Sequence, residues 1–122
     1  TNGFFDTNTR VLFSADVFGA LLDTPREDTA DIPESILRDG QTAWASVDAP
    51  WLGWADKSMF GALLSDVERL DPSTIISGHL PATSGKMIHT VLHNLMGAMG
   101  ASRSGGPDRE TIEGLFAQPM VA

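Results

Sequence analysis

Short β-type runs and helix-type repeats alternate along the chain. Apolar runs at residues 4–5 and 11–13 flank the polar stretch 6–10, whose Asp and Asn residues favour a turn. This pattern predicts a β-hairpin. A compact β-branched run at residues 74–77 predicts one further strand, which should be buried, and residues 78–81 are expected to form a loop.

A first helix is expected in the second quarter of the chain. Asp31, Pro33 and Glu34 combine an Asx cap, a proline in the first turn and an acid near the positive end of the helix dipole. The helix should run from there to Val47. The charged stretch 23–29 that precedes it predicts a surface loop.

Two later segments each place apolar residues on one helix face. Asp56 is a candidate cap for the second helix, and Ser84 is a candidate cap for the third. The apolar positions, spaced by three and four, are Met59, Leu63, Val67 and Leu70 in the second helix, and Met87, Ile88, Val91, Leu92, Leu95 and Met99 in the third. Met87, Met96 and Met99 are expected to fill the core.

The remainder of the chain is short. A small-residue linker is expected at residues 100–107 and a last helix at residues 108–117. The whole pattern predicts one α/β domain over residues 1–122, with its core in residues 4–100 and a few strands covered by helices. No initiator methionine precedes Thr1, which indicates a trimmed or partial chain.

Composition and charge narrow the function classes. With 122 residues, 42% of them apolar and 20% charged, the chain can form one domain with a real core. The net charge is −8 and no run of Lys or Arg exists to neutralise phosphates, so nucleic acid is not expected as a partner. Its apolar runs are far shorter than the roughly 20 residues of a membrane span, and no signal peptide is recognisable. We therefore expect a cytoplasmic protein that does not bind membranes.

Asp16 and His79 are the strongest candidates for chemistry. Asp16 lies in LFSADVFG, directly after the second apolar run, and His79 lies in TIISGHLP, directly after the buried strand. Ligands in α/β folds bind at the carboxyl ends of strands, where a carboxylate and an imidazole can share one divalent metal or a pair of metals. Because cysteine is absent, His, Asp, Glu or backbone oxygen must bind any metal. The alternative is structural, with Asp16 capping a turn and His79 hydrogen-bonded to a loop carbonyl.

These two segments resemble the metallo-β-lactamase fold family. Residues 12–19 look like the family's L-F-S-x-D-x-F-G segment, closest to its flavodiiron, oxygen-handling branch, and residues 76–81 look like its final S-x-H-x-P segment. The resemblance covers residues 4–85 and implies the C-terminal half of an αβ/βα sandwich. In the family the Asp bridges two metals and the last His binds one of them, which implies these roles for Asp16 and His79.

The sequence departs from the family before Asp16. The family's H-x-H-x-D-H cluster and a further His precede the bridging Asp, whereas no His precedes Asp16 here. A catalytic metal needs about three protein ligands. The chain is therefore expected to be the C-terminal half of such a protein, as a fragment or a truncated relative. It should be inactive without a missing N-terminal half or a second copy of itself.

The resemblance leaves several functions open. The main expectation is a metal-dependent hydrolase of a small molecule, in which two ions, zinc or iron, activate water. An alternative is part of a diiron oxygen or nitric oxide reductase, which needs a flavin domain that these residues do not contain. Another is a non-catalytic module that forms a homodimer, because half a sandwich leaves a sheet edge and an apolar face uncovered.

His89 and His93 form a second candidate metal site. Their spacing of four places both rings on one helix face, where they can grip zinc. No Glu follows His89, so the pair lacks the base that metalloprotease chemistry needs. The alternative is two packed or solvent-facing histidines. Either one could also complete a mononuclear site with Asp16 and His79.

Two further features bear on selectivity. Trp44, Trp51 and Trp54 cluster closely in sequence, and they either line a substrate pocket or pin helices together. The acidic residues around Asp28 and Asp31 either attract a cation or form a solvated loop. If the chain is part of an enzyme, this loop and the Trp cluster are expected to shape selectivity.

Overall fold

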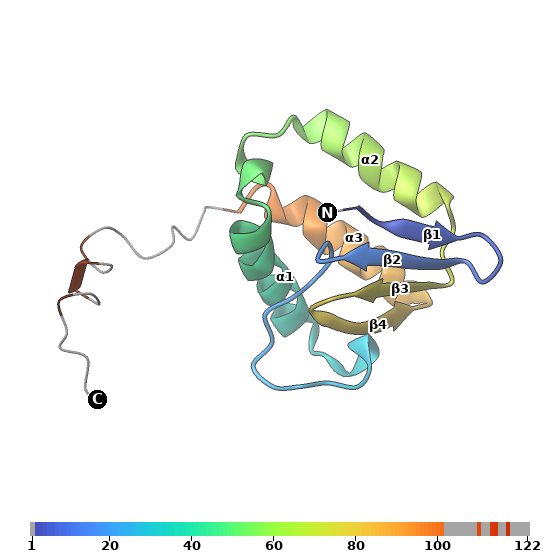
Figure 1. Ribbon diagram of the computed structural model, residues 1–122, viewed down its shortest axis with the longest axis horizontal. Helices are drawn as coiled ribbons and strands as arrows, with labels where there is room; N and C mark the ends of the chain where they lie inside the picture. Colours follow the sequence, from blue (N-terminus) through green and yellow to red (C-terminus); the bar gives the residue numbers. More distant parts are fainter. Residues whose placement is uncertain (1, 102–109, 111–112, 115–116, 118–122) are drawn as a thin grey trace.

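The computed structural model describes residues 2–101, 110, 113–114 and 117 of the chain. These residues form a four-stranded sheet with three α-helices and two short 3-10 helices (Figure 1). The strands are β1 (Phe4–Asp6), β2 (Val11–Ala15), β3 (Thr74–Ser77) and β4 (Leu80–Ser84). The helices are η1 (Thr29–Asp31), α1 (Glu34–Asp48), η2 (Pro50–Gly53), α2 (Lys57–Arg69) and α3 (Lys86–Ala98). The expected linker and last helix lie largely outside the described residues.

The sheet has the order β1-β2-β3-β4. The expected hairpin is confirmed, because β1 pairs antiparallel with β2 and the chain turns between Asp6 and Val11. β3, the expected strand at residues 74–77, pairs parallel with β2. Helices α1 and α2 separate these two strands in the sequence, so the centre of the sheet depends on a long-range crossover.

The loop expected at residues 78–81 is wrong in its second half. Leu80 starts β4, which pairs antiparallel with β3 through a tight connection at Gly78 and His79. Pro81 weakens the strand signal because it lacks a backbone donor, yet proline is tolerated in an edge strand such as β4. Ser84 consequently ends β4 and does not cap α3, whose N-cap is Gly85 without a side-chain hydrogen bond.

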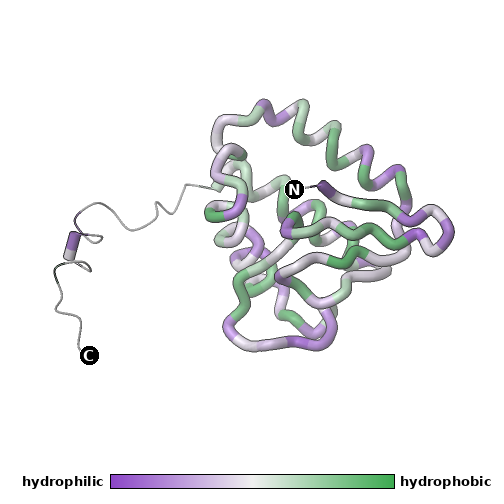
Figure 2. The backbone as a smooth tube through the Cα atoms, viewed as in Figure 1, coloured by the Kyte–Doolittle hydropathy of each residue, from purple (hydrophilic) through white to green (hydrophobic). Residues whose placement is uncertain are grey.

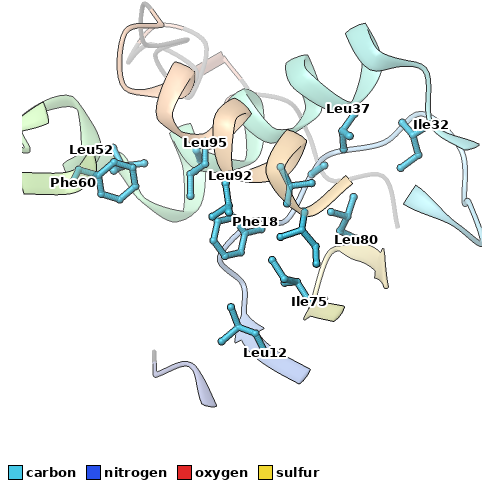
Figure 3. Close-up of a cluster of buried hydrophobic side chains, with 14 residues drawn as sticks. Leu12, Phe18, Ile32, Leu37, Leu52, Phe60, Ile75, Leu80, Leu92 and Leu95 are labelled. Atoms are coloured by element: carbon cyan, nitrogen blue, oxygen red, sulfur yellow. The ribbon is translucent and has the colours of Figure 1, made fainter. Parts of the chain in front are cut away.

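The core lies between one face of the sheet and the helices α1 and α3. Leu12 and Ile75, which are register partners on β2 and β3, point toward Phe18 and Leu92 (Figure 3). The hydropathy of the chain follows this arrangement, with apolar positions along the strands and a polar loop before η1 (Figure 2). Met87, Met96 and Met99 are half-buried against the core, so their expected role is confirmed.

The opposite face of the sheet is not covered by any described element. The next residues along β2 and β3, Phe13 and Ile76, are also register partners and are 43% and 41% exposed. Phe4 of β1 extends the same row. Its ring centroid lies 6.2 Å from that of Phe13, and its side chain is exposed to solvent. The uncovered face, defined by Phe4, Phe13 and Ile76, is therefore apolar.

The ends of α1 and α2 match the sequence to different degrees. Asp56 caps α2 as expected, because its Oδ1 accepts a hydrogen bond from the backbone N–H of Met59 at 2.8 Å. The expected cap of α1 is wrong. Asp31 belongs to η1, and Pro33 occupies the N-cap position without a side-chain hydrogen bond. No helix among the described residues is long and apolar enough to cross a membrane.

The face of α2 that packs differs in part from the expected one. Val67 is half-buried against the core as expected, but its companions there are Phe60 and Leu64. The expected Met59 and Leu63 are instead 71% and 60% exposed. Both sets obey helical spacing, so the sequence pattern does not choose between them. The choice is made by α3, which packs against α2.

The loop before α1 is also not wholly on the surface. Thr29 is fully buried, although it was expected in the surface loop at residues 23–29. Its Oγ1 donates to the backbone oxygen of Pro81 at 3.0 Å and lies 2.9 Å from Oγ1 of Thr83. These contacts fasten the loop to the edge strand β4, because a buried hydroxyl needs partners.

Gly40 of α1 provides a test of the packing between this helix and the loop that follows β2. A Cβ at Gly40 would lie 2.4 Å from the backbone oxygen of Leu21. The N–H of Leu21 also donates a hydrogen bond to the backbone oxygen of Gly40. We predict that Gly40→Ala destabilises the chain by about 1–3 kcal/mol, despite the gain expected from removing a helical glycine.

The matched control is Gly61→Ala in α2. A Cβ there would make an ordinary contact of 3.5 Å with Cε of Met96, so this variant should be more stable by about 0.5–1 kcal/mol. Urea unfolding of both variants measures the difference. Equal stabilisation of both would contradict the close packing at Gly40.

Candidate metal site

The parallel pairing of β2 with β3 brings Asp16 and His79 together. Each residue follows the carboxyl end of its strand, and these two ends meet at one edge of the sheet. Oδ1 of Asp16 lies 3.3 Å from Nε2 of His79, and the two side chains are 42% and 46% exposed. The structure therefore brings together the two residues that the sequence selected, at a place open to a ligand.

The backbone around the two residues is held by several hydrogen bonds. The N–H of Gly78 donates to the Ala15 oxygen at 2.7 Å, and the N–H of Ala20 donates to the His79 oxygen at 3.0 Å. The register of β2 against β3 shifts between Phe13 and Ala15, and Ala15 has a φ of 52°. Such a bulge re-aims the residue that follows it, here Asp16.

Two glycines make room for the side chains of the site. A Cβ at Gly78 would lie 2.8 Å from Oδ1 of Asp16. A Cβ at Gly19 would lie 2.7 Å from Nε1 of Trp44 and 3.0 Å from Cβ of His79. Any larger residue at either position forces a neighbouring side chain to move, so both glycines are part of the site.

Trp44 of α1 lies at the candidate site, a place that the sequence pattern did not reveal. Its Nε1–H donates to the backbone oxygen of Asp16 at 2.9 Å. Its ring lies against the imidazole of His79, with 4.0 Å between centroids and 39° between planes. Trp44 thus fixes the backbone at one candidate ligand and the ring of the other. The only sequence signal for it was membership of the Trp cluster.

The other two tryptophans of the cluster are on the surface. Trp51 is 54% exposed and packs edge-on against Phe60, with 6.1 Å between ring centroids. Trp54 is 74% exposed. The packing role is therefore seen for Trp51, which contacts α2 from η2, whereas Trp44 lies at the candidate site.

The donor atoms fit two ligands of a shared metal. Two bonds of about 2.1 Å that meet at octahedral to tetrahedral angles hold their donor atoms about 3.0–3.4 Å apart. The 3.3 Å between Asp16 and His79 lies in this range. Among the described residues, however, no group of three or more His, Asp or Glu side chains can hold a metal. Further ligands must come from elsewhere if a complete site forms.

The alternative candidates have local partners. Nδ1 of His89 lies 2.8 Å from Oε1 of Glu68 on α2, and its ring lies nearly parallel to that of His93 with 6.4 Å between centroids. In the acidic loop, Oδ1 of Asp28 accepts the N–H of Ala30 and so begins η1. Neither place gathers three metal-binding side chains in the described part of the chain.

Comparisons with known proteins identify the fold. No family model matches the chain, and no curated protein matches it in sequence. Among solved structures, rubredoxin oxygen:oxidoreductase from the anaerobe Desulfovibrio gigas is similar, with a TM-score of 0.62, 15% identity and coverage of 80% of this chain. The chemotaxis sensor ODP, solved as a peroxy diiron species, is similar with a TM-score of 0.55, 22% identity and coverage of 93%. The apo state of the chemotaxis sensor ODP from T. denticola matches with a TM-score of 0.52, 23% identity and coverage of 78%.

These similar proteins have the metallo-β-lactamase fold. The chain has the fold of a C-terminal half of that sandwich. This metallo-β-lactamase-like chain spans only 24% to 42% of the length of the three similar chains. At these identities the likeness concerns the fold alone, so the roles of Asp16 and His79 depend on the local geometry.

The close approach at Gly78 provides a test of that geometry. We predict that Gly78→Ala weakens the binding of Fe²⁺ to the chain by about tenfold or more, because the new Cβ displaces the Asp16 carboxylate. Isothermal titration with Fe²⁺ under anaerobic conditions measures the effect. Gly97→Ala is the matched control, because a Cβ there meets nothing within 4 Å. Equal affinities of the two variants would show that the carboxylate does not bind the metal.

Proposed function

We propose that this chain supplies two ligands, Asp16 and His79, to the diiron centre of a protein that handles dioxygen. The observation that carries the proposal is the 3.3 Å approach of Asp16 Oδ1 to His79 Nε2 at the carboxyl ends of two parallel strands. One structure with the same fold is an oxygen:oxidoreductase, and another is described as a peroxy diiron species. These likenesses support the diiron alternative better than the hydrolase that was the main expectation.

The donor set is compatible with iron. Imidazole and carboxylate are common ligands of non-haem iron, and zinc finds no particular support in the similar structures. When bound, the iron pair would supply electrons to dioxygen. The residues of this chain hold and orient the donor atoms. Asp16 has two oxygens and can reach two ions, whereas His79 can offer Nε2 to one ion.

Trp44 acts as a positioning residue in this proposal. A metal-binding imidazole needs a fixed ring orientation, and this ring lies 4.0 Å from the indole of Trp44. The hydrogen bond from Trp44 Nε1–H to the backbone oxygen of Asp16 means that this one side chain contacts both candidate ligands.

The remaining ligands come, in our proposal, with a segment that packs on the uncovered face. Phe4, Phe13 and Ile76 form a row on three adjacent strands, and a second sheet can bury them. That segment belongs to a preceding half of the same protein or to a second copy of this chain. In the isolated chain a second copy is the available partner, so we propose a homodimer.

Removal of both candidate ligands tests the metal site. We predict that Asp16→Ala/His79→Ala lowers the iron content of the purified chain by about tenfold or more, because each change deletes a donor atom. Elemental analysis after anaerobic loading with Fe²⁺ measures the content. Both side chains are about half exposed, so the double variant should keep its circular dichroism spectrum.

The control for that experiment is His89→Ala/His93→Ala. This pair lies on α3, away from the ends of β2 and β3, and should leave the iron content unchanged. Iron that is lost from the control variant and retained by the first one would contradict the proposed function. It would assign the metal to the helical histidine pair.

The uncovered face is tested by its effect on mass in solution. We predict that the native chain is a dimer and that Phe13→Thr/Ile76→Thr makes it a monomer, because the apolar row is interrupted at its centre. Light scattering after gel filtration measures the mass. Met59→Gln/Leu63→Gln is the control, because it removes two apolar side chains from α2 that are still more exposed than Phe13 and Ile76. A native monomer, or dissociation by the control alone, would refute the assignment of this face.

A further inference from the structure

An apolar cavity opens beside Asp16. It has a volume of about 120 Å³ and lies between the turn after β2, the C-terminal part of α1, η2 and the start of α2. Most of its wall is made of aromatic and aliphatic side chains. Phe18, Leu52, Phe60 and Leu95 of this wall are seen in the core cluster (Figure 3).

Three of the polar side chains of the wall, those of Asp16, Gln41 and Trp44, have partners already, and the fourth, Asp48, is exposed. Nε1–H of Trp44 donates to the backbone oxygen of Asp16. Nε2 of Gln41 donates to the Val91 oxygen at 3.2 Å, and its Oε1 accepts from Asn94 at 2.9 Å. A buried water needs about two to four polar partners. The interior of this cavity therefore offers little to water and suits an apolar occupant.

The size of the cavity limits that occupant. An apolar cavity of about 150 Å³ in another protein stays dry and binds benzene or xenon. The cavity here is slightly smaller. It suits a molecule of a few heavy atoms that makes no hydrogen bonds, such as a noble gas atom or a diatomic gas.

The cavity and the candidate metal site share three wall residues. Asp16 lines the cavity and approaches His79 with its Oδ1, and Trp44 lines the cavity and lies against the His79 ring, with 39° between the ring planes. Gly19 lies at the same junction, where a Cβ would strike the Trp44 indole. An occupant of the cavity is therefore held beside Asp16, one of the two candidate ligands.

We propose that this cavity is a binding site for a small apolar gas molecule, held next to Asp16 behind the wall formed by Trp44. The inference rests on the proposed function for the identity of the physiological gas, which is dioxygen. The cavity itself is formed by side chains of this chain and does not depend on bound iron. The sequence left two roles open for the Trp cluster, pocket lining and packing. In this proposal Trp44 and Trp51 have both roles, because they line the cavity and pack against neighbouring rings.

Xenon is the probe that tests the cavity without iron. Two-dimensional amide NMR spectra of the metal-free chain are recorded under increasing xenon pressure. We expect saturable shifts at Gly19, Ala45 and Leu95, which line the cavity. Shifts that grow linearly with pressure, or that are confined to Phe13 and Ile76 on the uncovered face, would overturn the proposal.

Variants of two alanines, Ala49 between α1 and η2 and Ala43 within α1, provide the matched comparison. Ala49→Leu fills the cavity and should reduce the saturable shifts by at least about fivefold. Ala43→Leu makes the same change outside the cavity and should leave the shifts intact. If Ala49→Leu fails to fold, Trp51→Ala replaces it. Trp51 is 54% exposed, and removal of its ring from the wall should weaken xenon binding. Unchanged binding in the filled or opened variant would overturn the proposal.

The result separates the cavity from the metal site. Xenon binding that persists in Asp16→Ala/His79→Ala supports the cavity, because the remaining walls still enclose it. Loss of iron binding in that variant bears on the proposed function alone. Bound Fe²⁺ is the reductant in a further test, which follows the rate at which dioxygen oxidises it to Fe³⁺. A rate that Ala49→Leu leaves unchanged, although xenon is excluded, would overturn the role of the cavity in holding dioxygen.

Discussion

The parallel pairing of β2 with β3 is the interaction on which the rest of the structure depends. It joins residues 11–15 to residues 74–77 across the whole length of α1 and α2. A parallel pair carries both strands to the same sheet edge, and there the chain leaves β2 through Asp16 and β3 through His79. An antiparallel pair would place these residues at opposite ends. The candidate site is therefore a consequence of the topology.

One face of this sheet is buried and the other is exposed. Leu12 and Ile75 are buried under α1 and α3, whereas their neighbours Phe13 and Ile76 face solvent. Strands buried on one side only normally alternate apolar and polar residues, but β2 and β3 carry large apolar residues on the exposed face as well. Large apolar residues on both faces are typical of a sheet that is covered on both sides. This agrees with a chain that spans 24% to 42% of the similar proteins and has the fold of half a sandwich.

The local parts of this structure follow from the sequence, and the long-range parts do not. The hairpin, the strand at residues 74–77 and the cap at Asp56 are set by turn residues, β-branched runs and a side-chain acceptor. The sequence pattern does not predict β4, because Pro81 is typical of a loop. It does not identify the packed face of α2 either, because that face is determined by contact with α3, which is distant in the sequence. Asp16 and His79 were found through their place after strands and a family resemblance. Trp44 became visible only when the fold brought α1 against the end of β2.

The central claim is that Asp16 and His79 form one metal-binding unit, and the three histidines of the chain allow a direct measurement. Long-range ¹⁵N NMR resolves the ring nitrogens of His79, His89 and His93 as Fe²⁺ is added anaerobically. The account predicts that in the native chain the His79 ring signals broaden before those of the other two histidines. In the Asp16→Ala variant the His79 signals should stay sharp at the same Fe²⁺ concentration. Broadening of the His89 and His93 signals with His79 unaffected would contradict it.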